Sequence, residues 1–193
     1  MSKGRLEAFS DGVIAILITI MVLELKPPHE GTLDALRPLW PVLSSYVLSF
    51  VFLGIYWNNH HHLLQAARQV NGRILWANLH LLFWLSLVPF VTAWMGDSHF
   101  APMAVAGYGV PLLMAGVAYY ILERALIAHH PHDQTLASAV GVDIKGVASI
   151  FIYGAAIPLA FVLPWLSCAL YVLVTILWLV PDRRIERALA SRT

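Results

Sequence analysis

The chain has 193 residues, of which 59% are hydrophobic and only 12% are charged, whereas an ordinary soluble domain carries roughly 25% charged residues. Its 12 Lys and Arg nearly balance its 11 Asp and Glu, and the formal net charge of +1 provides no field that would attract nucleic acid. The composition therefore argues against a soluble domain and a nucleic-acid partner, and it favours a protein embedded in a lipid bilayer.

Six apolar runs follow one another along the chain when they are measured against the helix of about 20 residues that crosses a hydrocarbon core. Pro27 and Pro28 end the first run, because proline cannot continue a helix. Pro158 and Pro164 divide the long uncharged stretch after Gly146 into the fifth and sixth runs. The expected spans are residues 6–25, 41–64, 74–95, 101–122, 146–163 and 166–180.

The predicted fold class is all-α, a polytopic membrane protein with six transmembrane helices. The apolar runs lack the alternation of polar and apolar residues that strands of a membrane barrel show. We expect one domain over residues 1–193, with a short tail at 182–193. The loops are too short to hold a soluble domain, so function must reside among the helices.

Orientation follows from the positions of Lys and Arg, because positive residues near span ends stay in the cytoplasm. If the amino terminus is inside, the outer segments hold only Lys26 and Arg37. Both termini are therefore predicted to be cytoplasmic. The inner segments would hold Lys3, Arg5, Arg68, Arg73, Arg124, Lys145, Arg183, Arg184, Arg187 and Arg192.

The first span opens with a polar motif made of Arg5, Phe9, Ser10 and Asp11. An ionisable group at membrane depth costs about 2.5 to 3.5 kcal/mol on insertion scales, so Asp11 is a functional candidate that needs a partner. The second span ends, and the third begins, with polar residues in the same inner third of the membrane. We therefore predict a hydrogen-bonded belt in which Ser10 and Asp11 meet Trp57, His60 or His61, and Asn78.

A second face of the first span is largely apolar. At 100° per residue, Ile16, Thr19, Ile20 and Leu23 form one stripe, and Asp11 lies about 140° from Ile16. The polar motif therefore points into neighbouring helices while the stripe points elsewhere. An apolar stripe in a membrane helix commonly packs against another helix or lipid, so the stripe does not by itself define a pore.

These residues resemble the first-helix signature of the bacterial relatives of the lysosomal potassium channel, the transmembrane protein 175 family. The signature here is Arg5-x-x-x-Phe9-Ser10-Asp11-Gly12, followed by Ala15-Ile16 and Thr19. Similar matches occur in the later spans and cover most of the chain. They are Tyr56-Trp57-x-x-His60-His61-x-Leu63, Asn78 with Pro89-Phe90-x-Thr92, and Pro181-Asp182-Arg183-Arg184.

The resemblance implies a potassium-preferring cation channel in the bacterial inner membrane, and not an enzyme. It implies a homotetramer, since each bacterial chain carries one six-helix repeat, with the first helix lining the pore. Ile16 would form a hydrophobic constriction, and selectivity would come from the narrow pore and Thr19 in place of a carbonyl filter. The permeant species would be potassium, with no cofactor or metal. Glu7 and Glu24 are either cation-attracting groups at the pore mouths or solvated helix ends.

Three other interpretations compete with this one. Gly107-Tyr108-Gly109 is similar to a potassium-channel filter, but it stands inside an expected span and is better explained by close helix packing. A metalloenzyme would need clustered histidines, whereas consecutive His60 and His61 diverge by 100° on a helix. The histidines at 129, 130 and 132 fall in an expected loop. A proton-coupled secondary transporter using Asp11 and the His60/His61 pair remains the stronger alternative.

Overall fold

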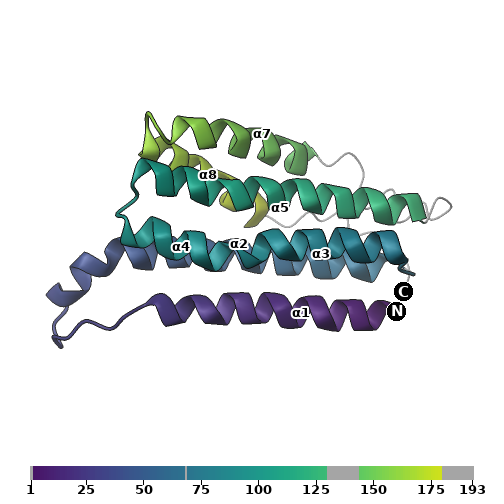
Figure 1. Ribbon diagram of the computed structural model, residues 1–193, viewed down its shortest axis with the longest axis horizontal. Coiled ribbons are helices and arrows are strands. Elements are labelled where there is room, and N and C mark those ends of the chain that lie inside the picture. Colours follow the sequence, from purple (N-terminus) through teal and green to yellow (C-terminus); the bar gives the residue numbers. More distant parts are fainter. Residues whose placement is uncertain (1, 68, 130–143, 180–193) are drawn as a thin grey trace.

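The computed structural model describes residues 2–67, 69–129 and 144–179, and all regular secondary structure in these ranges is helical. The helices lie side by side along one direction (Figure 1). The expected all-α fold is therefore confirmed. The elements are α1 (Lys3–Ile20), η1 (Met21–Glu24), η2 (Asp34–Leu39), α2 (Trp40–Ala66), α3 (Gly72–Ser86), α4 (Val88–Asp97), α5 (Pro102–His129), α7 (Ile144–Leu159) and α8 (Pro164–Leu179).

Helix α1 lies alone along one edge of the bundle (Figure 1). It packs on α2 and α3, while α5 packs between the α3–α4 pair and α7, and α8 packs against α7. One side of α1 is thus held by the rest of the chain and the other side is left open.

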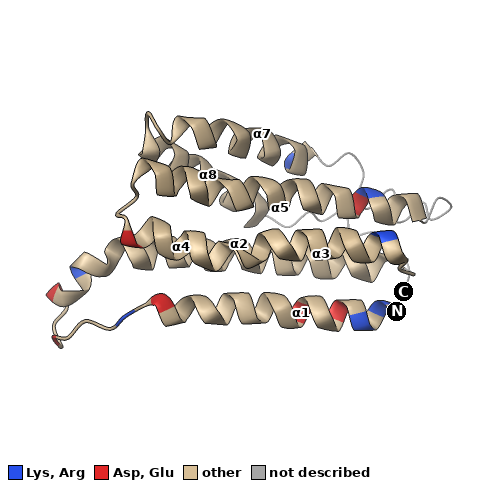
Figure 2. Cartoon of the chain, viewed as in Figure 1, with Lys and Arg blue, Asp and Glu red and all other residues tan. Residues whose placement is uncertain are grey.

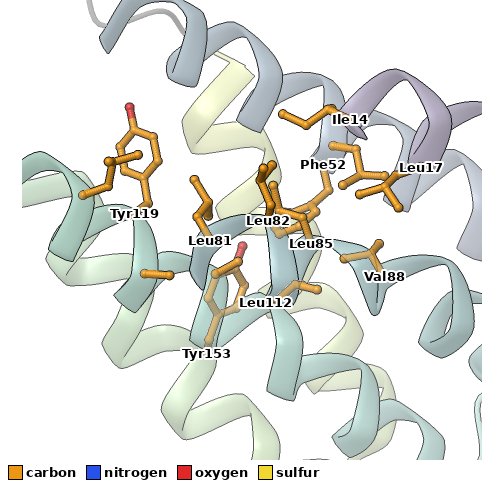
Figure 3. Close-up of a cluster of buried hydrophobic side chains, with 14 of the residues drawn as sticks. Ile14, Leu17, Phe52, Leu81, Leu82, Leu85, Val88, Leu112, Tyr119 and Tyr153 are labelled. Atoms are coloured by element: carbon orange, nitrogen blue, oxygen red, sulfur yellow. The ribbon is translucent and has the colours of Figure 1, made fainter. Parts of the chain in front are cut away.

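The core that holds α1 in place is a cluster of aliphatic and aromatic side chains (Figure 3). Ile14 and Leu17 of α1 are buried, and Figure 3 places them beside Phe52 of α2. Burial of a side chain of this size contributes about 1.5–3 kcal/mol relative to exposure in water. In a membrane the competing solvent is lipid, so close packing and polar contacts must supply the specificity of this interface.

Four helical segments are long and apolar enough to cross a membrane, at residues 3–24, 34–66, 72–97 and 102–129, and α7 and α8 are shorter apolar helices. The segments follow the expected spans in order along the chain. The tail at 182–193 lies outside the described residues.

The helices differ in detail from several expected spans. The fourth span, 101–122, continues as α5 to His129, so the prediction that this histidine lies in a loop is wrong. The third span, 74–95, is interrupted at Leu87, because Pro89 has no N–H to continue the helix. The first span, 6–25, changes at Met21 from α-helix to the tighter 3₁₀ form, so Leu23 no longer follows the 100° spacing. The fifth span, 146–163, ends as a helix at Leu159, and a turn leads into Pro164.

Charged residues gather at the two ends of the bundle and leave its middle largely uncharged (Figure 2). Lys26 and Arg37 lie at the end opposite the amino terminus. The end that holds the amino terminus carries Lys3, Arg5, Arg73, Arg124 and Lys145.

Small residues on α5 allow close helix packing, as the sequence predicts. A Cβ atom on Gly107 would come within 2.5 Å of the Trp94 ring, and one on Gly109 would overlap the Tyr171 hydroxyl. Both glycines are therefore required by packing, and the Gly-Tyr-Gly run is an ordinary part of helix α5.

Gly109→Ala is expected to destabilise the protein, because the new methyl group would force Tyr171 to move within a packed core. Overpacking of this kind costs about 1–3 kcal/mol. The melting temperature of the detergent-purified protein measures the effect. Gly154→Ala is the matched control, since a Cβ there meets no heavy atom within 4 Å. Equal melting temperatures for the two variants would refute the packing role of Gly109.

A polar clamp and an exposed stripe on the first helix

A buried hydrogen-bonded chain joins α1 to α2 and α3. The Asn78 Nδ2 atom donates to Ser10 Oγ (2.9 Å), and Ser10 Oγ donates to the Leu6 carbonyl oxygen (2.9 Å). His60 Nε2 lies 2.6 Å from Asn78 Oδ1. Because a carboxamide oxygen only accepts, His60 must donate and carry its proton on Nε2. We call this set, Ser10, His60 and Asn78, the polar clamp.

The polar clamp is inaccessible from outside the chain. Ser10 and Asn78 are 0% exposed and His60 is 1% exposed. Leaving one buried donor or acceptor unsatisfied costs about 1–3 kcal/mol, so these three side chains strongly favour one rotation of α1 against α2 and α3. The clamp thereby sets which face of α1 is buried and which is open.

Asp11 forms a separate and less buried contact. Its Oδ1 atom accepts a hydrogen bond from Trp57 Nε1 (3.0 Å), with Asp11 half-buried and Trp57 exposed. The His61 ring stacks on Trp57 at 6.0 Å between ring centroids, and its Nε2 lies 2.8 Å from Gln65 Nε2. The structure thus divides the expected belt into the polar clamp and an Asp11–Trp57 pair, with His61 in neither set of hydrogen bonds.

The remaining motif residues lie on the outside of the chain. Arg5 and Phe9 are exposed on α1. Glu7 lies 3.6 Å from the ammonium group of Lys3, which also donates to the Gln65 carbonyl oxygen (3.2 Å). Glu24 is exposed at the other end of the first span, more than four helical turns away.

The predicted stripe lies on the open side of α1. Ile16 is 62% exposed, and Thr19, Ile20 and Leu23 are also exposed, whereas Ile14 is fully buried. The Thr19 hydroxyl lies 3.0 Å from the carbonyl oxygens of both Ala15 and Ile16. Its proton is therefore directed back along the helix, which leaves oxygen lone pairs to face outward.

A second polar cluster was not predicted from the sequence. Ser49 Oγ of α2 lies 2.6 Å from Thr92 Oγ1 of α4 and 2.9 Å from the Tyr108 hydroxyl of α5. The cluster therefore joins these three helices. Thr92 also donates to the Val88 carbonyl oxygen (2.6 Å), at the break between α3 and α4. The only sequence signal was the presence of hydroxyl groups inside three apolar runs.

In the part of the chain that the structure describes, no group of three or more His, Cys, Asp or Glu side chains is placed to hold a metal ion. The histidines at 130 and 132, which the metalloenzyme interpretation would use, lie outside the described residues.

The membrane-length helices and the clamped first helix define an α-helical polytopic membrane protein. The family model described as "Endosomal/lysosomal potassium channel TMEM175" matches residues 5–89. A protein of Chryseobacterium sp. (strain P1-3), named a potassium channel, is 52% identical over 189 residues, which is 98% of each chain. The chain therefore belongs to the TMEM175 family, a family of ion channels.

A solved structure supports the assignment. The crystal structure described as a lysosomal potassium-selective channel TMEM175 homolog from Chamaesiphon minutus aligns with a TM-score of 0.78 and 28% identity, over 92% of this chain and 96% of that one. A mouse relative, named an endosomal/lysosomal proton channel, is 29% identical over 78% of this chain and 27% of its own length.

Proposed function

We propose that this protein is a potassium-preferring cation channel, with both termini in the cytoplasm and a pore lined by α1 in a homotetramer. The observation that carries the proposal is the open face of α1 around Ile16. That face lies opposite the fully buried side chains Ser10 and Ile14, at the edge of the bundle. Four such edges around a common axis would enclose a narrow, mostly apolar channel.

Within this pore, Ile16 would be the hydrophobic constriction. A ring of four isoleucine side chains excludes water, and a dewetted constriction blocks ions without a moving plug. Thr19 lies one helical turn further along, and its outward lone pairs would offer the cation a partial replacement for its hydration shell. This arrangement requires no carbonyl filter.

The charges at the two ends of the first span agree with a pore that conducts cations along α1. Glu24 is exposed beyond the stripe, where its carboxylate would concentrate cations at the outer mouth. Glu7 would do less at the inner mouth, because Lys3 neutralises part of its charge. The concentration of Lys and Arg at the amino-terminal end supports a cytoplasmic location for that end.

Proton-coupled transport through Asp11 and the His60/His61 pair is less well supported. Among the described residues, Asp11 bonds to an indole N–H, which does not release a proton, and the chain from His60 ends at the Leu6 carbonyl oxygen. A relay would need a titratable path between Asp11 and the histidines, and these hydrogen bonds provide none.

Reconstitution of the full chain into planar bilayers tests the proposal. We expect potassium currents above about 10⁶ ions per second per channel, far beyond the 1–10³ per second typical of turnover-limited proteins. When a potassium gradient is set across the bilayer and sodium replaces the missing potassium, the reversal potential should lie near the potassium equilibrium potential. Slow, saturating flux that depends on a proton gradient would instead establish the transporter, and a reversal potential that follows pH would establish a proton channel.

A further inference from the structure

An open groove runs between α3 and α5 at the end of the bundle that carries the amino terminus. Its volume is about 970 Å³. It lies away from the open face of α1, so the proposed pore does not use it. The residues that carry the argument are Asn71, Arg73, Trp76, His80, Ile121 and His129.

The end of the groove that lies furthest from the middle of the bundle is basic. Arg73 is exposed in the first turn of α3 and brings a positively charged guanidinium group to the groove. Ion pairs among the described residues join Lys3 to Glu7 and Arg37 to Asp34, so none of them neutralises Arg73.

The imidazole beside this charge is fixed in orientation. Asn71 Nδ2 donates to His129 Nδ1 (3.1 Å), so the neutral His129 ring carries its proton on Nε2. Asn71 itself is held in place because its Oδ1 atom accepts from the Ile74 backbone N–H (3.0 Å). The end of the groove therefore carries the positive charge of Arg73, and the Asn71–His129 hydrogen bond joins its two walls.

The groove becomes apolar toward the membrane centre. Trp76 lies about 4.5 Å along the helix from Arg73 and is 75% exposed. On the facing helix, Ile121 lies about 12 Å from His129 and is 42% exposed. His80 at this level already accepts a hydrogen bond from Trp84 Nε1 (2.9 Å). A positive end followed by an exposed aromatic and aliphatic wall matches the polarity of one phospholipid molecule.

We propose that this groove binds an anionic phospholipid from the leaflet on the arginine-rich side, with the phosphate at Arg73 and an acyl chain along Trp76 and Ile121. Basic pockets between transmembrane helices recognise anionic headgroups in this way. A zwitterionic lipid would bring its own ammonium group close to Arg73, so the site selects a net negative headgroup.

Native mass spectrometry of the purified full-length protein tests this proposal with phosphatidylglycerol and phosphatidylcholine as probes. We expect one phosphatidylglycerol per chain to be retained in preference to phosphatidylcholine. Arg73→Gln should weaken phosphatidylglycerol binding about tenfold, the effect of losing one charged contact, and Arg73→Lys should keep most of it. Arg37→Gln is the control, because it removes an exposed arginine at the opposite end of the bundle.

Several results would overturn the lipid site. Equal retention of the two lipids by the unmodified protein would do so, and so would unchanged phosphatidylglycerol binding in Arg73→Gln. Displacement of the lipid by equimolar inorganic phosphate would show a plain anion site instead. Disulfide formation between copies of Trp76→Cys in a Cys168→Ser background would show that a second chain covers the groove. Each readout is independent of conduction, so failure here leaves the channel proposal intact.

Discussion

Ile16→Asn is expected to raise the single-channel potassium conductance severalfold in planar bilayers. A ring of amide groups would hydrate the constriction that four isoleucines keep dry. If hydration lowers the barrier by about 1.4 kcal/mol, conductance rises about tenfold. Ile16 contributes little to the fold, since it is 62% exposed, so the variant should retain the melting temperature of the unmodified protein.

Ile176→Asn provides the matched control for this result. Ile176 is 54% exposed on α8, so the same substitution adds the same amide to an exposed apolar face away from α1. We expect its conductance to equal that of the unmodified protein. If Ile16→Asn also leaves conductance unchanged, Ile16 does not form the constriction.

Asn78→Leu is expected to cause the largest loss of stability, because it removes the central member of the polar clamp. Ser10 Oγ would lose its donor and His60 Nε2 its acceptor, and both atoms belong to buried side chains. Each unsatisfied group costs about 1–3 kcal/mol. Thermal or denaturant unfolding in detergent measures the loss, and Asn58→Leu is the control at an exposed position of α2.

A double-mutant cycle separates the clamp from a general packing defect. Ser10→Ala with Asn78→Leu removes both partners of one hydrogen bond, so the double variant should lose less stability than the two single variants together. Residues within one hydrogen-bonded network couple by about 0.5–3 kcal/mol. Additive effects would mean that Ser10 and Asn78 do not act through their mutual hydrogen bond.

The depth of the polar residues was predictable from the sequence. Because a helix rises by a fixed amount per residue and successive spans run in opposite directions, Ser10, Trp57, His60 and Asn78 were expected at one level. The structure brings them together in two adjoining sets of hydrogen bonds. Their roles in a channel remain part of the proposal.

Helix rotation was harder to predict than depth. Helix α2 carries apolar residues on nearly all of its sides, so the sequence does not indicate whether His60 or His61 faces α3. The same uncertainty hid the cluster of Ser49, Thr92 and Tyr108, whose hydroxyl groups meet only at one set of rotations for three helices. The assembly of several chains was also not predictable from the residues alone. An exposed Ile16 suits a helix face that contacts lipid as well as one that lines a pore.

Cysteine accessibility during conduction tests most directly the central claim that the open face of α1 lines the pore. In a Cys168→Ala background, Ile16→Cys should be blocked irreversibly by Ag⁺, because a soft thiolate captures a permeating soft cation. Phe151→Cys, at a site 74% exposed on α7, should conduct as before. Block at Ile16→Cys alone is the predicted result, whereas continued current through that variant in Ag⁺ would contradict a pore lined by this helix.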